Sequence, residues 1–137
     1  MDEPETGATA TAAMKVRTRD LASVLPLEAG DAYPAVLATS RMIALMEIAA
    51  SRILRPLLRD GELSVGVAVD VAHTAPTPVG ASVIATARYV RRDGNVFVFE
   101  VRAADPAGEI GKGVHKRAIV SEERLMHGAA KRTGPSL

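Results

Sequence analysis

Residues 39–73 read TSRMIALMEIAASRILRPLLRDGELSVGVAVDVAH, and the hydrophobic period of the chain changes within this stretch. In its first half the apolar side chains recur every three or four positions, which is typical of a helix with a broad apolar face. These side chains are Met42, Ile43, Met46, Ala49, Ala50, Ile53 and Leu54. We expect a helix that begins at Thr39, with the hydroxyl of Thr39 or Ser40 as its cap, and that ends at Pro56 and the Asp60-Gly61 pair.

After Gly61 the period becomes two, which predicts a strand with its bulky side chains on one face. The bulky positions are Leu63, Val65, Val67, Val69 and Val71. Residues 81–91 and 95–104 predict two further strands joined by a tight turn at Asp93-Gly94, and residues 109–121 predict a last strand. Upstream of the helix, residues 14–24 predict a weaker strand, and residues 25–34 predict a loop because they contain two prolines and a glycine.

This order of elements limits the architecture. An antiparallel sheet joined by hairpins has an apolar face to cover, and only one substantial helix is predicted to cover it. We therefore expect an α+β fold in which a curved antiparallel sheet wraps around one long central helix. The sheet would expose unpaired edge strands, and pairing with a second copy of the chain would remove that liability, so we expect a homodimer, alone or within a larger assembly.

The composition is that of a single globular domain. The chain has 137 residues, of which 47% are hydrophobic and 24% are charged, and this predicts one core with an ordinary charged surface. Only 3% are aromatic, so aliphatic residues, alanine and methionine are expected to fill the interior. We expect the domain at residues 14–127, between a disordered tail at residues 1–13 and a flexible tail at residues 128–137.

Composition also disfavours several classes of protein. A net charge of +1 without a long basic run disfavours a nucleic-acid-binding surface. The chain has no cysteine, which excludes disulfides and thiol nucleophiles, and no histidine spacing suggests a metal site. No apolar segment approaches the ~20 residues that cross a membrane, and none has the pattern of a secretory signal, so we expect a cytoplasmic protein.

Three polar residues are candidates for chemistry. Glu47 lies within the apolar pattern of the helix, either at its edge with the carboxylate in water or beside a cavity that uses the charge. His73 ends the valine-rich strand before the TAPTP loop, as a structural histidine or as a residue at a cleft. Thr39 stands at the start of the helix, as an ordinary cap or as a hydroxyl that faces a substrate.

The last strand offers a second group of polar residues. His115 and Arg117 fall on one face of it, where two glycines leave space, so they either line a pocket or stand at a closely packed strand edge. Arg88 and Lys116 are candidates for contacts with phosphate groups, although a solvated surface is the simpler interpretation.

Three segments together resemble the fluoroacetyl-CoA thioesterase family of hotdog-fold proteins. They are YPAVLATSRMIALMEIAASRIL at residues 33–54, VGVAVDVAHTAPTPVGASV at residues 65–83 and GEIGKGVHKRAIV at residues 108–120. In that family a catalytic Thr stands just before the central helix, a Glu lies within it, and a His begins an HTxxTPxG-like motif. Thr39, Glu47 and His73 hold those places here, and the resemblance runs over residues 31–120.

The resemblance implies a hotdog-fold thioesterase that hydrolyses an acyl-CoA or acyl-carrier-protein thioester at a site shared by two subunits. It implies His73 as the general base, Glu47 as the nucleophile or the activator of water, and Thr39 as a hydrogen-bond donor to Glu47 or the substrate. Amides at the start of the helix are expected to stabilise the oxyanion. No metal or redox cofactor is implied, and coenzyme A is part of the substrate.

Further contacts with the substrate are expected near these three residues. The expected substrate-binding residues are Tyr33, Ser40, Gly66, Arg88, His115, Lys116 and Arg117, with the basic ones at the phosphates of coenzyme A. The segment before Thr39 offers only Tyr33 as an aromatic, and Gly30 supplies no bulk, so an acyl group other than fluoroacetyl is expected. The alternatives are a non-catalytic module that binds or sequesters a thioester, and a hotdog dehydratase or cyclase of a biosynthetic pathway.

Overall fold

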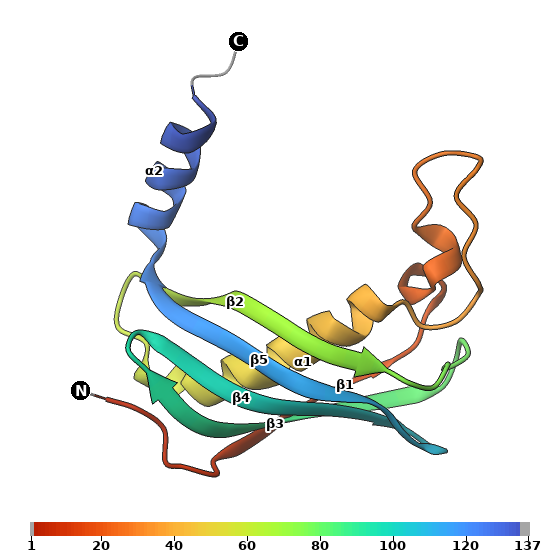
Figure 1. Cartoon of the computed structure of the whole chain (residues 1–137), viewed down its shortest axis with the longest axis horizontal. Helices are drawn as coiled ribbons and strands as arrows, with labels where there is room; N and C mark the ends of the chain where they lie inside the picture. The colour runs from red at the N-terminus through yellow and green to blue at the C-terminus, as the bar shows by residue number, and fades with distance from the viewer. Residues whose placement is uncertain (1, 135–137) are drawn as a thin grey trace.

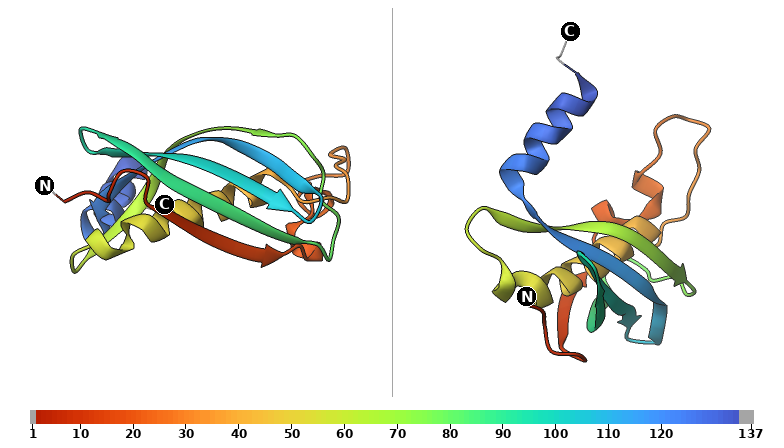
Figure 2. Two further views of the ribbon diagram at one scale, coloured as in Figure 1. Left: turned by 90° about the horizontal axis from the view of Figure 1, so that it is seen from below. Right: turned by 60° about the vertical axis from the view of Figure 1, so that its left-hand side comes forward.

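The computed structural model describes residues 2–134 as one antiparallel sheet with a helix against its concave face (Figure 1). The strands are β1 (Thr9–Lys15), β2 (Glu62–His73), β3 (Ser82–Asp93), β4 (Val96–Asp105) and β5 (Gly108–Ser121). Their order across the sheet is β1-β3-β4-β5-β2, and every neighbouring pair is antiparallel. The sheet curls around helix α1 (Thr39–Leu54), as Figure 2 shows, which confirms the predicted curved sheet around one central helix.

Helix α1 occupies the concave face because its apolar residues form a broad stripe. The buried residues of the helix are Met42, Leu45, Met46, Ala49, Ala50, Ile53 and Leu54. The helix packs mainly against β1 and β3. It ends close to the predicted position, because Pro56 lies in a 3-10 turn, η3 (Arg55–Leu57), that follows it directly and a proline cannot continue the helical hydrogen bonding.

The core concentrates the few aromatic residues of the chain. Tyr89, Phe97 and Phe99, on β3 and β4, are buried. The ring centroid of Tyr89 lies 5.7 Å from that of Phe99 and 6.3 Å from that of Phe97. The remaining core residues are aliphatic residues, alanine and methionine, as expected. A chain poor in aromatics thus places three of its four in one cluster.

Both ends of the chain are more regular than predicted. Residues 9–13, expected in a disordered tail, belong to β1, and residues 14–24 hold the end of β1 and the 3-10 turns η1 (Thr18–Asp20) and η2 (Ala22–Val24) instead of a strand. The β1 sequence TATAAMK has little apolar bulk, and pairing with β3 places it in the sheet. The tail prediction is also wrong for residues 128–133, which complete helix α2 (Glu122–Thr133). Residues 1 and 135–137 lie outside the described residues.

Loop contacts bring the start of α1 beside the end of β2. The Leu37 N–H donates to the carbonyl oxygen of Thr77 at 2.8 Å, which ties the segment before α1 to the loop after β2. The Ala38 N–H donates to the carbonyl oxygen of Asp20 at 2.9 Å. These bonds hold the first residue of α1 and the last residue of β2 at one end of the sheet.

Strand β2 forms an open edge of the sheet. Its outer side pairs with no strand in residues 2–134, and Leu63, Val67 and Val69 are exposed along it. Its register with β5 shifts between Gly66 and Ala68, so the strand bends there. Among residues 2–134, no helix has the length and apolar character needed to cross a membrane.

Candidate active site

Thr39 and His73 meet where α1 begins and β2 ends. The Oγ1 atom of Thr39 lies 2.8 Å from Nδ1 of His73, within hydrogen-bond distance. The other ring nitrogen, Nε2, is buried and has no hydrogen-bond partner among residues 2–134. Buried polar atoms are nearly always hydrogen-bonded in proteins. The imidazole is therefore held at Nδ1, while Nε2 lacks the hydrogen-bond partner that a buried nitrogen usually has.

The hydroxyl of Thr39 is not the helix cap. Ala38 occupies the N-cap position, and Thr39 is the first residue of the helix. The prediction that Thr39 or Ser40 caps α1 is therefore wrong, because the Thr39 hydroxyl bonds to His73 and Ser40 lies inside the helix with an exposed side chain. The segment before α1 is instead held by its backbone hydrogen bonds.

A cavity of about 370 Å³ opens beside the Thr39–His73 pair. Its lining residues are Ala22, Tyr33, Pro34, Val36, Leu37, Thr39, His73, Thr74, Ala75 and Pro76. Most of these side chains are apolar, and the polar groups of the lining belong to Tyr33, Thr39, His73 and Thr74. Tyr33, predicted to contact substrate, is half exposed at this cavity.

Glu47 belongs to a second polar group, formed with His115 and Arg117 of β5. Its Oε2 atom accepts a hydrogen bond from Nη1 of Arg117 at 3.1 Å and lies 3.8 Å from Nε2 of His115. The Glu47 side chain is 37% exposed, whereas those of His115 and Arg117 are buried. The carboxylate therefore reaches the surface, as the first interpretation from the sequence has it, and it has charged and polar partners; it is not among the residues that line the cavity beside Thr39.

The hydrogen bonds of His115 determine its tautomer. Nδ1 lies 2.8 Å from the carbonyl oxygen of Ala68, which only accepts, so Nδ1 carries the proton. Nε2 is then an acceptor for Nη1 of Arg117 at 3.1 Å. Burial lowers the pKa of His115; the bond to Ala68 opposes this effect, the Arg117 charge reinforces it, and the Glu47 charge opposes it. His115 is thus a neutral ring that orients Arg117.

Arg117 is held from several directions. Its Nε donates to Oγ of Ser64 at 3.0 Å, and its Nη2 donates to the carbonyl oxygen of Ser64 at 2.9 Å. Burial lowers the pKa of Arg117, and the neighbouring Glu47 carboxylate counteracts that effect. The role of Ser64 was not predicted, because on an alternating strand it resembles any other polar position.

Gly66 on β2 leaves the space that Glu47 occupies. A Cβ atom at this position would overlap Oε2 of Glu47 and lie 3.3 Å from Cε1 of His115. The predicted site residue Gly66 is therefore placed beside Glu47, where a larger residue would displace the carboxylate.

The two polar groups do not meet within the described chain. Glu47 follows Thr39 by eight residues on α1, which separates them by about 12 Å along the helix axis at roughly 1.5 Å per residue. The structure brings Thr39 to His73 and Glu47 to Arg117, so one chain holds two partial sites.

Two of the predicted phosphate-binding residues lie elsewhere. Arg88 of β3 pairs with Glu100 of β4 at 2.9 Å, and both side chains are more than half exposed. Lys116 alternates with His115 and Arg117 along β5, so its side chain points to the opposite face. The structure does not bring either residue to the cavity beside Thr39.

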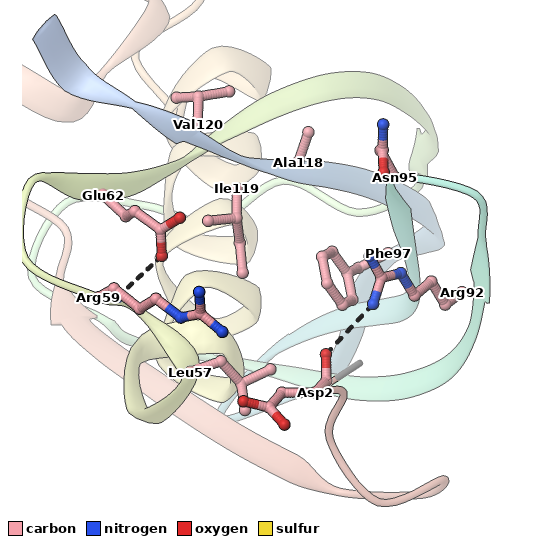
Figure 3. Close-up of a pocket in the computed structure, with 10 residues that line it drawn as sticks. All are labelled: Asp2, Leu57, Arg59, Glu62, Arg92, Asn95, Phe97, Ala118, Ile119 and Val120. Atoms are coloured by element: carbon pink, nitrogen blue, oxygen red, sulfur yellow. Dashed lines mark hydrogen bonds between the residues drawn. The ribbon is translucent and has the colours of Figure 1, made fainter.

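A larger cavity, of about 520 Å³, lies at the other end of α1 (Figure 3). Its lining residues are Asp2, Leu57, Arg59, Glu62, Arg92, Asn95, Phe97, Ala118, Ile119 and Val120. Two guanidinium groups and two carboxylates balance its charge, and the predicted site residues lie outside its lining. Within residues 2–134, no group of three or more His, Asp or Glu side chains is arranged to hold a metal ion.

Comparison with known protein sequences points to one family. The sequence model of the fluoroacetyl-CoA-specific thioesterase family matches residues 16–123. Over 93 residues the chain is 42% identical to the fluoroacetyl-CoA thioesterase of Streptantibioticus cattleyicolor, and this match covers 68% of the chain and 67% of that protein.

Solved structures agree with the sequence comparison. The fluoroacetyl-CoA thioesterase FlK matches with a TM-score of 0.88 and 34% identity, over 98% of this chain and 100% of that chain. A FlK variant in complex with acetyl-CoA gives a TM-score of 0.89 and 33% identity, over 95% and 99% of the two chains. A thioesterase superfamily member from Thermus thermophilus gives a TM-score of 0.85 and 25% identity, over 97% of this chain and 96% of that chain. The predicted hotdog fold and the predicted family resemblance are both confirmed.

Proposed function

The chain belongs to the fluoroacetyl-CoA-specific thioesterase family and is a thioester hydrolase that acts on acyl-CoA, and we propose that it does so with Thr39, His73 and Glu47 at a site shared by two subunits. The observation that carries the site assignment is the His73 ring, bound to Thr39 at Nδ1 and buried without a partner at Nε2. Family membership favours hydrolysis over a non-catalytic binding module and over a dehydratase or cyclase.

In the proposed mechanism His73 is the general base and Thr39 orients it. When Nδ1 donates to Oγ1 of Thr39, Nε2 is unprotonated and accepts a proton from the water that attacks the carbonyl carbon. The tetrahedral intermediate then collapses, the C–S bond breaks, and the proton passes from His73 to the departing thiolate of coenzyme A. The first amides of α1 have no partner within the helix and are proposed as donors to the oxyanion.

Glu47 has two possible roles in this scheme, and both use a carboxylate that Arg117 holds in place. It either attacks the carbonyl carbon, so that the C–S bond breaks and coenzyme A leaves as the thiolate that takes up a proton, and the resulting acyl anhydride is then hydrolysed by water, or it orients the attacking water. Solvent ¹⁸O found in the Glu47 carboxylate after a single turnover, or a trapped acyl-enzyme, would identify the first route.

A shared site would join the two partial sites of the chain. Antiparallel pairing of two β2 strands closes the open sheet edge and gives a two-fold dimer. Gly66, which lies against Glu47, is in the first half of β2, and His73 is its last residue. Antiparallel pairing puts the end of one strand beside the first half of the other, which supports an approach of His73 to Glu47 of the partner subunit.

The cavity beside Thr39 supports a short acyl group. It is small and largely apolar, and apolar walls with a few polar groups are usual for small-molecule sites. We propose coenzyme A as the thiol, with an acyl-carrier protein as the alternative. A base, a carboxylate and water suffice for the hydrolysis, so we propose no metal or redox cofactor. A cytoplasmic location stays a prediction.

Release of free thiol from a panel of short acyl-CoAs tests the proposal. The chain has no cysteine, so a thiol reagent reports only coenzyme A. We expect turnover by the wild-type protein and none by Glu47→Ala or His73→Ala, with melting temperature as the control for folding. Turnover retained in both variants would contradict the site assignment, and the acyl chain turned over fastest would identify the substrate class.

A further inference from the structure

Helix α2 projects away from the rest of the chain. It continues directly from β5, with Oγ of Ser121 accepting a hydrogen bond from the Arg124 N–H at 3.3 Å at its start. None of its residues is buried, and Figure 1 shows it standing off the end of the sheet. An isolated helix of this length is marginal in water, so α2 is expected to need a surface to pack on.

The side chains of α2 suit such a surface. Leu125 and Met126 are large, apolar and exposed. Ala129 and Ala130 follow them at a spacing of four, which places them on the same side of the helix. Lys131 and Arg132 give the far end of the helix a positive charge.

A second projection stands at the other end of β2. Residues 25–34, here named the acidic loop, contain Glu28 and Asp31, and Leu27 is 96% exposed within it. Figures 1 and 2 show α2 and the acidic loop rising from opposite ends of β2 on the same side of the molecule. The strand has 12 residues, so about 40 Å separates its ends at roughly 3.3 Å per residue. The two projections therefore cannot touch within one chain.

We infer that α2 of each subunit packs against the acidic loop of a second copy of this chain and forms the outer wall of that copy's cavity at Thr39 and His73. This inference rests on the proposed β2-to-β2 dimer, in which antiparallel pairing brings the α2 end of one subunit to the loop end of the other. Leu125 and Met126 then meet Leu27, and Lys131 and Arg132 face Glu28 and Asp31. The apolar contact and the opposite charges select the same partner surface.

Cross-linking of single cysteines tests the contact directly, because the chain has no cysteine of its own. The variants Met126→Cys and Leu27→Cys are mixed under conditions of subunit exchange and treated with a short bis-maleimide. Both positions are exposed, so folding is not at risk. We expect a covalent species of two chains that contains one of each variant. Met126→Cys mixed with Glu100→Cys is the control, because Glu100 is exposed on β4, in the middle of the sheet.

Light scattering of the wild-type protein shows whether the chain is a dimer, and so separates a failure of the proposed dimer from a failure of the contact between α2 and the acidic loop. A dimer that cross-links through Leu27→Cys and not through Glu100→Cys supports it. A dimer that fails to cross-link through Leu27→Cys, or that links equally through both, overturns the α2 contact and leaves the dimer standing. A monomer overturns both. In the active dimer, the double variant Leu125→Asp/Met126→Asp should raise KM for acyl-CoA about tenfold, a change of about 1.4 kcal/mol. An unchanged KM would contradict the inference that α2 forms the outer wall of the cavity.

Discussion

At the residue scale, the Thr39 hydroxyl has a single described partner, Nδ1 of His73. Thr39→Val keeps the shape of the side chain and removes this bond, whereas Thr39→Ser keeps the hydroxyl. We expect Thr39→Val to lower kcat by about tenfold or more, because a bond of about 1.4 kcal/mol that holds the base corresponds to that factor. Steady-state kinetics with a short acyl-CoA measures the effect. Near-normal kcat in Thr39→Ser is the control, and normal kcat in Thr39→Val would show that the bond does not orient the base.

His115 makes stability depend on pH. Burial lowers its pKa in the folded state, while the unfolded chain keeps the ordinary value of about 6.5. Above that value both states are neutral and His115 adds no pH dependence. As the pH falls below it, the unfolded chain binds the proton first, so the free energy of unfolding decreases until the folded-state pKa is reached.

His115→Gln removes this contribution. We expect the stability difference between the wild-type protein and the variant to shrink from pH 7.5 to pH 5.5, measured by urea unfolding. His127→Gln is the matched control, because it makes the same substitution at a histidine that is exposed on α2. Parallel curves for the wild-type protein and His115→Gln would show that His115 titrates normally in the folded state.

At the scale of elements, the close approach of β2 to α1 depends on Gly66. In Gly66→Ala the new methyl group displaces the end of the Glu47 side chain, which is flexible and partly exposed and can turn into solvent. We expect kcat to fall at least about tenfold, since the proposed catalytic carboxylate is displaced. We expect the melting temperature to fall as well, since the buried guanidinium of Arg117 loses its paired carboxylate. Gly128→Ala, with open space around the new methyl group, should keep full activity. A fully active Gly66→Ala enzyme would mean that Glu47 works from another position.

The elements differ in how well the sequence predicts them. Helix α1 and the hairpins of β3, β4 and β5 bury one regular face each. Their apolar residues therefore recur with a period of about 3.6 in the helix and 2 in the strands, which the sequence shows. Strand β1 and helix α2 lack that pattern. TATAAMK gains its place from pairing with β3, and α2 buries no residue within the chain, so neither needs a hydrophobic pattern. The Ser121 cap with acidic residues behind it was the one local signal for α2.

The candidate site likewise has a part that the sequence predicts and a part that it does not. The positions of Thr39, Glu47 and His73 in their elements follow from local patterns and from the family resemblance. Their grouping does not, because the bond between Thr39 and His73 joins residues 34 apart in sequence, and the bond between Glu47 and Arg117 joins residues 70 apart. Such contacts depend on the order of strands in the sheet and on hydrogen bonds between loops, and the spacing of residues within a short segment does not predict either.

At the scale of the whole molecule, the described chain is an incomplete object. One edge of its sheet is open along β2, two projections extend past that edge, and its two polar groups stand about 12 Å apart along α1 at 1.5 Å per residue. The proposed second copy on the β2 edge would account for all three features. It would pair with the open strand, give α2 a surface to pack on, and bring the end of each β2 toward Glu47 of the partner subunit.

A shared site predicts that two inactive variants restore each other. In a dimer of Glu47→Ala and His73→Ala chains, one site has Thr39 and His73 from the first chain and Glu47 from the second, and is intact. Half of the dimers are mixed and half of their sites are intact, so co-expression should recover about a quarter of wild-type activity in a two-fold dimer. Thr39→Ala with His73→Ala is the control, because both changes damage the same half-site and every mixed site is defective. Recovery in neither mixture would place the whole site within one chain, and His73 would then need another carboxylate than Glu47.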